Sequence, residues 1–322
     1  MQRGHLTALY GLILVCLSLI IYTLMRSNES QEILKDPDEE VPISTPKTSL
    51  RDSVRIFQLP DSLSFAGEPV PLSIADVSER LERELYVNAY WESNMVLLMK
   101  RSAKFLPQIE RWLKANEIPD DFKYLAIAES GLLDVASPAG ARGFWQFMES
   151  TAKEYGLEVN NNVDERYHLE KSTKAAADYL RKAFQKFGAW TAVAASYNMG
   201  QSGFARRQEE QLSTSFYDLY LNEETSRYLF RILAFKIIFE NPAYFGFHLG
   251  PKDYYQNPTF HKIEVMEDIK NLSLWAKKNN SNYKELKKYN PWLRDKQLNV
   301  KRGKSYMLIL PEQSPIFRES SD

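Results

Sequence analysis

The chain has 322 residues, of which 44% are hydrophobic and 13% aromatic, enough for a packed core in one large domain or two smaller ones. The 41 Lys and Arg residues nearly balance the 42 Asp and Glu residues, and the formal net charge of -1 gives no electrostatic basis for binding nucleic acid. One cysteine and four scattered histidines argue against a disulfide framework or a metal site, so we expect no metal and no cofactor.

The N-terminus contains twenty consecutive residues without a charge, from Leu6 to Met25. As an α-helix this stretch would be about 30 Å long, which is the thickness of the hydrocarbon core of a bilayer. A cleaved signal peptide is the alternative, although its apolar region is usually shorter, at roughly 7–15 residues. Lipidation at Cys16 is not favoured, because small residues do not precede it. We therefore predict an uncleaved membrane anchor over residues 1–26.

The rest of the chain divides by composition into three parts. Residues 27–75 carry the acidic run KDPDEE and six prolines with little periodicity, which predicts a flexible linker. Residues 76–250 have apolar residues at helical spacing and predict one all-α domain, with Asp76 as its first helix cap. After Pro251 the pattern changes, and residues 258–312 predict a small βααβ module of two strands and two short helices. The predicted fold class is mainly α, with a small α+β module.

One carboxylate lies within an otherwise apolar helical pattern. Five residues recur at the spacing of one helix face: Phe122, Leu125, Ala126, Glu129 and Leu133. Because an unpaired buried carboxylate is costly, one interpretation makes Glu129 the structural partner of an arginine such as Arg142. The other interpretation makes burial functional, since desolvation raises the pKa of a carboxyl group. Such a group stays protonated near neutral pH and can protonate a glycosidic oxygen.

Two glycine- and aromatic-rich stretches carry side chains that suit a saccharide, which needs aromatic surfaces for its rings and hydrogen bonds for its hydroxyl and acetamido groups. In GARGFWQF, Gly140 and Gly143 allow close approach of the backbone, and Gln146 offers both a donor and an acceptor. In SYN, Tyr197 and Asn198 end a very apolar helix. Asn198 has the simpler interpretation of a C-terminal helix cap.

A further stretch, EETSRYLF, places Glu224 and Tyr228 one helical turn apart. Glu224 is also explained as a favourable acid in the first turn of a helix that Asn222 caps. Each motif alone therefore has a structural explanation. The functional interpretation depends on the order of the motifs along the chain.

That order resembles the family 1, Slt-type lytic transglycosylases, whose catalytic domain has a lysozyme-like fold. Over about residues 119–247, ESG, GFWQF, SYN and ETSRYL stand where the family has Glu-Ser, Gly-Leu-Met-Gln, Ala-Tyr-Asn and Glu-Thr-x-x-Tyr-Val. Phe144, Trp145 and Ser196 depart from these motifs. The resemblance implies that Glu129 is the general acid and then the general base. It implies saccharide-positioning roles for six further residues: Ser130, Gln146, Tyr197, Asn198, Tyr228 and, secondarily, Glu224.

The tail resembles a LysM module, a small βααβ unit that binds N-acetylglucosamine polymers. Leu286, Asn290, Pro291 and Leu293 match the pattern Leu-x-x-x-Asn-Pro-x-Leu, whereas the opening segment lacks the usual glycine and threonine. The resemblance therefore implies the fold more strongly than the affinity. We expect this module to help retain the protein on the cell wall and to take no part in bond cleavage.

Together the resemblances imply a peptidoglycan lytic transglycosylase of the cell envelope, membrane-anchored with its catalytic domain in the periplasm. It would cleave the MurNAc–GlcNAc β-1,4 bond of glycan strands and leave a 1,6-anhydroMurNAc end. A hydrolase needs a second carboxylate at a defined distance from the acid. Asp134 is more simply a turn residue and Glu149 part of a helix start, so no such partner is assured. A lysozyme-type hydrolase and a non-catalytic peptidoglycan-binding tether are the alternatives, and the intact motifs argue against the tether.

Overall fold

A computed structural model describes residues 54–313, so the predicted anchor over residues 1–26 and the first half of the predicted linker lie outside the described residues. Within residues 54–313, no helix combines the length and the apolar character that a membrane crossing requires. The chain divides into two compact units, residues 1–56 and 57–322, and the description below concerns the second.

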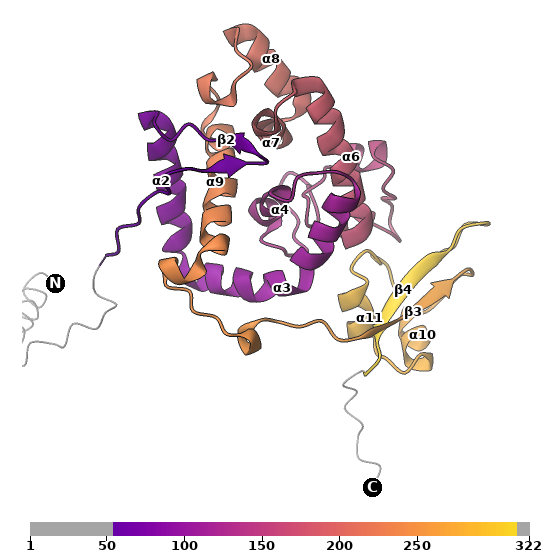
Figure 1. Ribbon diagram of the computed structural model, residues 1–322. Helices are drawn as coiled ribbons and strands as arrows, with labels where there is room; N and C mark the ends of the chain where they lie inside the picture. Colours follow the sequence, from indigo (N-terminus) through magenta and orange to yellow (C-terminus); the bar gives the residue numbers. More distant parts are fainter. Residues whose placement is uncertain (1–53, 314–322) are drawn as a thin grey trace, which may run out of the picture. The chain divides into compact units, whose positions relative to one another are not determined.

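The helical body follows the predicted all-α pattern (Figure 1). Its α-helices are α2 (Ala75–Ala89), α3 (Glu92–Ala115), α4 (Phe122–Ser130), α5 (Glu149–Glu154), α6 (Leu169–Phe187), α7 (Trp190–Met199), α8 (Gln201–Gln211) and α9 (Glu223–Glu240). Short 3-10 helices cover Glu165–Tyr167, Phe216–Asp218, Pro242–Phe245 and Pro251–Asp253. Helix α9 packs against α2, α4 and α7, while α6 packs against α3 and α7. Figure 1 shows α4 in the middle of the helical body, enclosed by these longer helices.

The central position of α4 follows from its sequence, FKYLAIAES, which is apolar around most of its circumference. Its residues from Tyr124 to Ile127 are all buried. The helix ends at Ser130, where Gly131 adopts a left-handed conformation with φ +57°. Leu133, predicted on the same helix face as Glu129, therefore lies beyond the helix, and it is exposed.

Two predicted helix starts have different outcomes. The side chain of Asn222 accepts a 2.8 Å hydrogen bond from the backbone N–H of Thr225, which confirms it as the cap of α9. Asp76 is not a cap, because α2 begins at Ala75 with Ile74 at the N-cap position. Asp76 instead lies in the first turn, where its charge is favourable at the positive end of the helix dipole.

The predicted linker extends too far toward the C-terminus, because residues 57–75 are part of the folded unit. Two short strands, β1 (Ser64–Phe65) and β2 (Glu68–Pro69), form an antiparallel pair. Phe57, Phe65 and Val70 are buried in the same apolar core as the helices. Two-residue strands and isolated anchoring side chains have no period, which is why composition alone indicated a linker.

The C-terminal module, residues 258–312, has the predicted βααβ order. Its elements are β3 (Phe260–Val265), α10 (Leu272–Lys278), α11 (Tyr283–Tyr289) and β4 (Tyr306–Pro311). The strands pair antiparallel, from Phe260 opposite Pro311 to Val265 opposite Tyr306. Asn290 explains the Asn-Pro motif: fully buried, it donates 2.7 Å to the carbonyl oxygen of Ile309 and accepts 2.9 Å from the Ile309 N–H.

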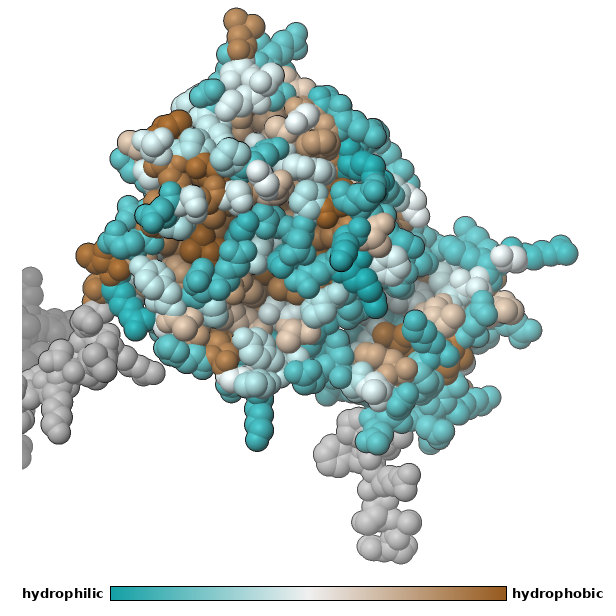
Figure 2. Space-filling model, in the orientation of Figure 1, coloured by the Kyte–Doolittle hydropathy of each residue, from teal (hydrophilic) through white to brown (hydrophobic). Residues whose placement is uncertain are grey.

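The apolar side chains of the C-terminal module form a buried cluster separate from the core of the helical body, and Val163 and Tyr167 of the body belong to it. Residues 260–312 contain twelve Lys and Arg against six Asp and Glu. In Figure 2 the visible face of this module is mostly hydrophilic, whereas apolar patches interrupt the surface of the helical body.

Candidate active site

Glu129 lies in the last turn of α4, and its carboxylate meets α9. The hydroxyl of Tyr228, a buried residue of α9, donates a short hydrogen bond to Glu129 Oε1. Burial is the main cause that raises the pKa of Glu129 from 4.5 to about 7, with a smaller contribution from the charge of Glu224. The Tyr228 hydrogen bond and the charge of Arg231 act in the opposite direction. The surroundings of Glu129 therefore allow its carboxyl group to give and take a proton near neutral pH, as the second interpretation of the sequence expects.

Arg231 is part of this site, and the sequence reasoning missed it. Its guanidinium lies 3.0 Å from Glu224 on the same helix and 3.5 Å from the carboxylate of Glu84 on α2. Glu84 is 1% exposed and also binds Arg227 of α9 at 2.6 Å. The spacing of seven residues from Glu224 to Arg231 was a usable signal, because it places the two side chains on one helix face. The contact between Arg231 and Glu84 has no such signal in the sequence, because α2 and α9 are far apart along the chain.

Arg142 is not the partner that one interpretation of the sequence gave to Glu129. Its guanidinium instead donates a 3.5 Å hydrogen bond to the hydroxyl of Tyr167. Arg142 belongs to the stretch 135–147, which we call the active-site loop, and it bridges both ends of that loop by pairing with Ala136 and with Phe147.

Tyr197 connects α7 to the active-site loop. Its hydroxyl donates a 2.6 Å hydrogen bond to the carbonyl oxygen of Trp145. The indole N–H of Trp145 in turn donates 3.0 Å to the hydroxyl of Thr173 on α6. Burial, followed by the neighbouring Glu129, holds the pKa of Tyr197 far above its ordinary value, so Tyr197 stays a neutral hydrogen-bond donor. Phe144 and Trp145, which depart from the family motif, are buried and contribute to the core.

Gln146 has a backbone φ of +47°, and its side-chain amide nitrogen donates 2.8 Å to the Gly143 carbonyl and 3.2 Å to the Val135 carbonyl. Both amide protons are therefore used within the active-site loop. Toward a saccharide Gln146 would serve as an acceptor, rather than as the donor and acceptor expected from the sequence.

Asn198 and Ser130 also form internal bonds. Asn198 accepts 2.7 Å from the hydroxyl of Thr225, which ties the end of α7 to the start of α9, and it lies inside α7 rather than capping it. The Ser130 hydroxyl donates 3.1 Å to the carbonyl of Ala126 and accepts 3.1 Å from the N–H of Leu132. These bonds fix the end of α4 next to Glu129.

Asp134 and Glu149 are the first two acids after Glu129 in the sequence. Glu149 starts α5 as predicted, is exposed and binds Lys153 at 2.6 Å. The side chain of Asp134 reaches the surface, but surrounding protein raises its pKa to about 6, against the opposing charge of Arg294 from the C-terminal module. Of these two acids, only Asp134 has a raised pKa and would hold a proton above the ordinary range of a carboxyl group.

Replacement of Gly143 by a residue with a side chain is expected to destabilise the protein strongly. A Cβ added there would lie 1.9 Å from the carbonyl oxygen of Arg166, and its φ of +78° disfavours side chains. We expect Gly143→Ala to destabilise the protein by about 3–5 kcal/mol, from backbone strain and overpacking together. Gly140→Ala is the control, because Gly140 has φ +92° but no atom within 4 Å of the added Cβ. Denaturant unfolding of both variants measures the difference, and equal losses would contradict the contact with Arg166.

With this geometry in place, two family models match the chain. Residues 108–219 match the transglycosylase SLT domain, and residues 261–314 match the soluble lytic transglycosylase C-terminal LysM-like domain. These matches confirm the resemblance to Slt-type lytic transglycosylases, the lysozyme-like fold class of the helical body and the LysM-like class of the module. The SLT match includes Glu129, Gln146 and Tyr197 but ends before Glu224 and Tyr228.

Two curated relatives are the membrane-bound lytic murein transglycosylases D of Escherichia coli strains K12 and O6:H1 (CFT073). Each is 24% identical over 269 residues, which are 81% of this chain and 58% of the relative. The chain thus spans a little over half the length of these relatives. An X-ray structure of an inactive mutant of the lytic transglycosylase Slt from Pseudomonas aeruginosa aligns with TM-score 0.35 and 18% identity. That alignment covers 42% of this chain and 24% of the other.

Proposed function

We propose that this protein is a peptidoglycan lytic transglycosylase that cleaves the MurNAc–GlcNAc β-1,4 bond. The observation that carries the proposal is the carboxyl group of Glu129, with a pKa of about 7 and a hydrogen bond from Tyr228, within a domain that matches the SLT family. The relatives named as lytic murein transglycosylases support the same substrate class.

In the first step, protonated Glu129 donates its proton to the glycosidic oxygen, and the bond between that oxygen and the anomeric carbon of MurNAc breaks. The positive charge that develops at the anomeric carbon is met by the 2-acetamido group of the same sugar, as the family resemblance implies. Tyr228 holds the carboxylate that remains, because its hydroxyl stays a donor at the pH of the reaction.

In the second step, the Glu129 carboxylate removes the proton of the C6 hydroxyl of MurNAc, and the C6 oxygen forms a bond to the anomeric carbon. The product is a 1,6-anhydro ring, Glu129 is protonated again, and no water is consumed. The C6 hydroxyl has an intramolecular advantage over water once the sugar is held in place. A pKa near 7 suits both steps, since one group must act as acid and then as base.

The hydrolase alternative has one observation in its favour, the raised pKa of Asp134 in the loop after α4. A second carboxylate acting on water would leave a reducing end instead of an anhydro ring. The two chemistries therefore differ in where the oxygen at the anomeric carbon comes from.

Digestion of purified sacculi in water labelled with heavy oxygen separates the two mechanisms. We expect anhydro ends without label, identified by mass spectrometry of the released fragments. A lysozyme-type hydrolase in the same water supplies the control, with one labelled oxygen at each reducing end. Labelled reducing ends from this protein would overturn the proposal and make Asp134 or Glu224 the second carboxylate.

We also propose that residues 1–26 anchor the protein in a membrane, with its catalytic domain in the periplasm. The uncharged stretch of twenty residues and the membrane-bound relatives support this location. We expect the full chain to sediment with membranes in cell fractionation and a chain that begins at residue 27 to be released. Sedimentation of both forms would contradict the anchor.

The six residues proposed to position the saccharide are Ser130, Gln146, Tyr197, Asn198, Tyr228 and Glu224. We propose different tasks for them, which their internal bonds support. Tyr228 acts directly on Glu129, and Tyr197 holds the active-site loop through Trp145. Glu224 binds Arg231 and so acts through the charges around Glu129.

A further inference from the structure

The C-terminal module is joined to the helical body by backbone pairing. Residues 162–164 of the body run antiparallel to residues 292–294 of the module, with a bridge between Val163 and Leu293. Two backbone hydrogen bonds, of 2.9 and 2.8 Å, flank the bridge, one from the Asp164 N–H and one from the Arg294 N–H. The module therefore pairs through its backbone with the segment 158–168 of the helical body, which we call the module-facing segment.

Side chains of the module-facing segment complete the core of the module. Val163 and Tyr167 are 1% and 4% exposed and belong to the apolar cluster of the module rather than to that of the helical body. The guanidinium of Arg294 lies 4.5 Å from the centre of the Tyr167 ring. Trp292 stacks on Tyr306 at 5.6 Å within the module. Without the module, this segment would expose apolar surface and lose its backbone partners.

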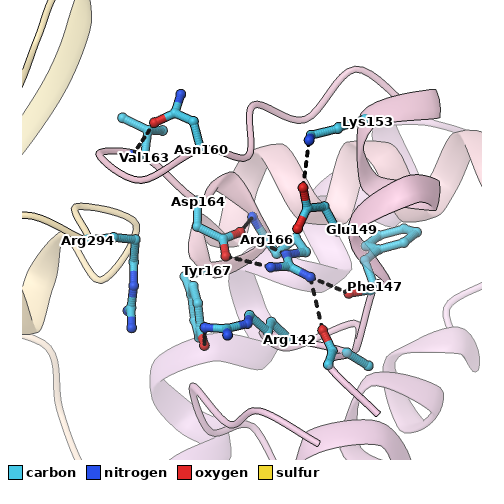
Figure 3. Close-up of polar contacts among 12 residues, drawn as sticks. Arg142, Phe147, Glu149, Lys153, Asn160, Val163, Asp164, Arg166, Tyr167 and Arg294 are labelled. Carbon is cyan, nitrogen blue, oxygen red and sulfur yellow. Dashed lines mark hydrogen bonds and ion pairs between the residues drawn. The ribbon is translucent and has the colours of Figure 1, made fainter.

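The module-facing segment also contacts the active-site loop, through the side chain of Arg166 (Figure 3). Arg166, which is 3% exposed, binds Asp164 with two hydrogen bonds of 2.9 and 2.8 Å. Its remaining amino group donates 3.1 Å to the carbonyl of Gly140 and 3.2 Å to the carbonyl of Phe147. These two carbonyls bracket Gln146, so the guanidinium of Arg166 sets the shape of the loop on which Gln146 lies.

Asp164 contacts both the C-terminal module and the arginine that holds the active-site loop. Its N–H donates to the carbonyl of Trp292 in the module, and its carboxylate binds the Arg166 side chain that holds the loop. Tyr167 makes a second connection, because its ring lies under Arg294 and its hydroxyl accepts from Arg142 of the active-site loop. In Figure 3, Arg294 approaches Tyr167 from the module while Arg142 lies on the other side.

We propose that the C-terminal module positions the active-site loop for catalysis. The backbone carbonyl of Trp292 acts through Asp164 and Arg166, and the side chain of Arg294 acts through Tyr167. This inference rests on the proposed function and gives the module a role beyond the wall retention expected from the sequence. It makes the module part of the catalytic unit even on a soluble substrate that needs no retention.

The test uses the full chain with Trp292→Ala, Trp292→Phe and, as the matched control, Leu274→Ala at an exposed position of α10. The Trp292 ring packs on His168 of the module-facing segment and on Tyr306, so its removal should loosen the backbone pairing that places the loop. On soluble glycan fragments we expect Trp292→Ala to lower kcat/KM about tenfold, with the pH dependence unchanged. Trp292→Phe, which keeps an aromatic ring, should recover most of the activity, and Leu274→Ala should behave as wild type. Equal kcat/KM in folded Trp292→Ala and wild type would overturn the inference.

Hydrogen exchange provides a readout that does not depend on the proposed function. In Trp292→Ala we expect faster amide exchange across residues 135–147, while α7 and α9 keep their wild-type rates. If Trp292→Ala does not fold, Arg294→Ala replaces it, with an expected threefold loss of kcat/KM and the same faster exchange in the loop. Wild-type exchange in the loop of a folded variant would overturn the inference. A wild-type protein without lyase activity but with the exchange effect would overturn only the proposed function.

Discussion

Replacement of Glu129 by glutamine is expected to reduce peptidoglycan cleavage to background. Glutamine keeps the shape of the side chain and removes the proton that both steps of the proposed reaction need. The loss of general acid–base help alone is worth roughly 10²–10⁴ in rate. Release of soluble fragments from purified sacculi measures it, and Glu149→Gln is the matched control because Glu149 is exposed and bonded to Lys153. A folded Glu129→Gln variant that digests sacculi at the wild-type rate would refute the role of Glu129.

The same substitution should make the protein more stable at alkaline pH. The pKa of Glu129 is about 7 in the folded state against an ordinary value of 4.5, so the folded state binds the proton more tightly than the unfolded state. Stability is therefore lost as the pH rises from about 4.5 through 7. The full loss is at most about 3.4 kcal/mol at 1.36 kcal/mol per tenfold change in acid dissociation. Glu129→Gln avoids this loss at pH 8 and should bring no comparable gain at pH 4, where the wild type has not yet lost stability. Glu149→Gln should show no gain at pH 8 in thermal unfolding.

The arrangement of the candidate site could be predicted from the sequence where it depends on local periodicity. Glu129 stood out because α4 is apolar around it, and the cap at Asn222 placed Glu224 in the first turn of α9. The same periodicity wrongly extended to Leu133, because it does not register the left-handed glycine that ends the helix at Gly131.

The rest of the site depends on contacts between residues that are distant in the sequence. Glu84 reaches Arg231 across 147 positions, and a lone acid on α2 gives no signal of such a partner. The link from the C-terminal module to the active-site loop uses backbone groups of Asp164 and Trp292, which carry no side-chain pattern. The sequence also gives no sign that residues 57–75 are packed. Their two short strands have no period, and their buried side chains contact helices that are distant in the sequence.

Tyr228→Phe is expected to weaken catalysis and to move its pH dependence upward. Phenylalanine keeps the buried ring but removes the hydroxyl that donates to Glu129. A hydrogen bond to a charged group contributes about 1.5–3 kcal/mol, so kcat/KM should fall roughly 10- to 100-fold. The bond also lowers the pKa of Glu129, because it stabilises the carboxylate, and its loss therefore raises that pKa above 7.

The direction of the pH shift distinguishes this role from a purely structural one. The proposed reaction begins with protonated Glu129, so kcat/KM of the wild type should decline as the pH rises through about 7. In Tyr228→Phe this decline should start at a higher pH. Tyr197→Phe is the matched control, since its hydroxyl bonds to the Trp145 carbonyl instead of Glu129. It should lower activity by loosening the active-site loop without moving the alkaline limb, and a limb that moves downward or stays in place in Tyr228→Phe would show that Tyr228 does not set the proton affinity of Glu129.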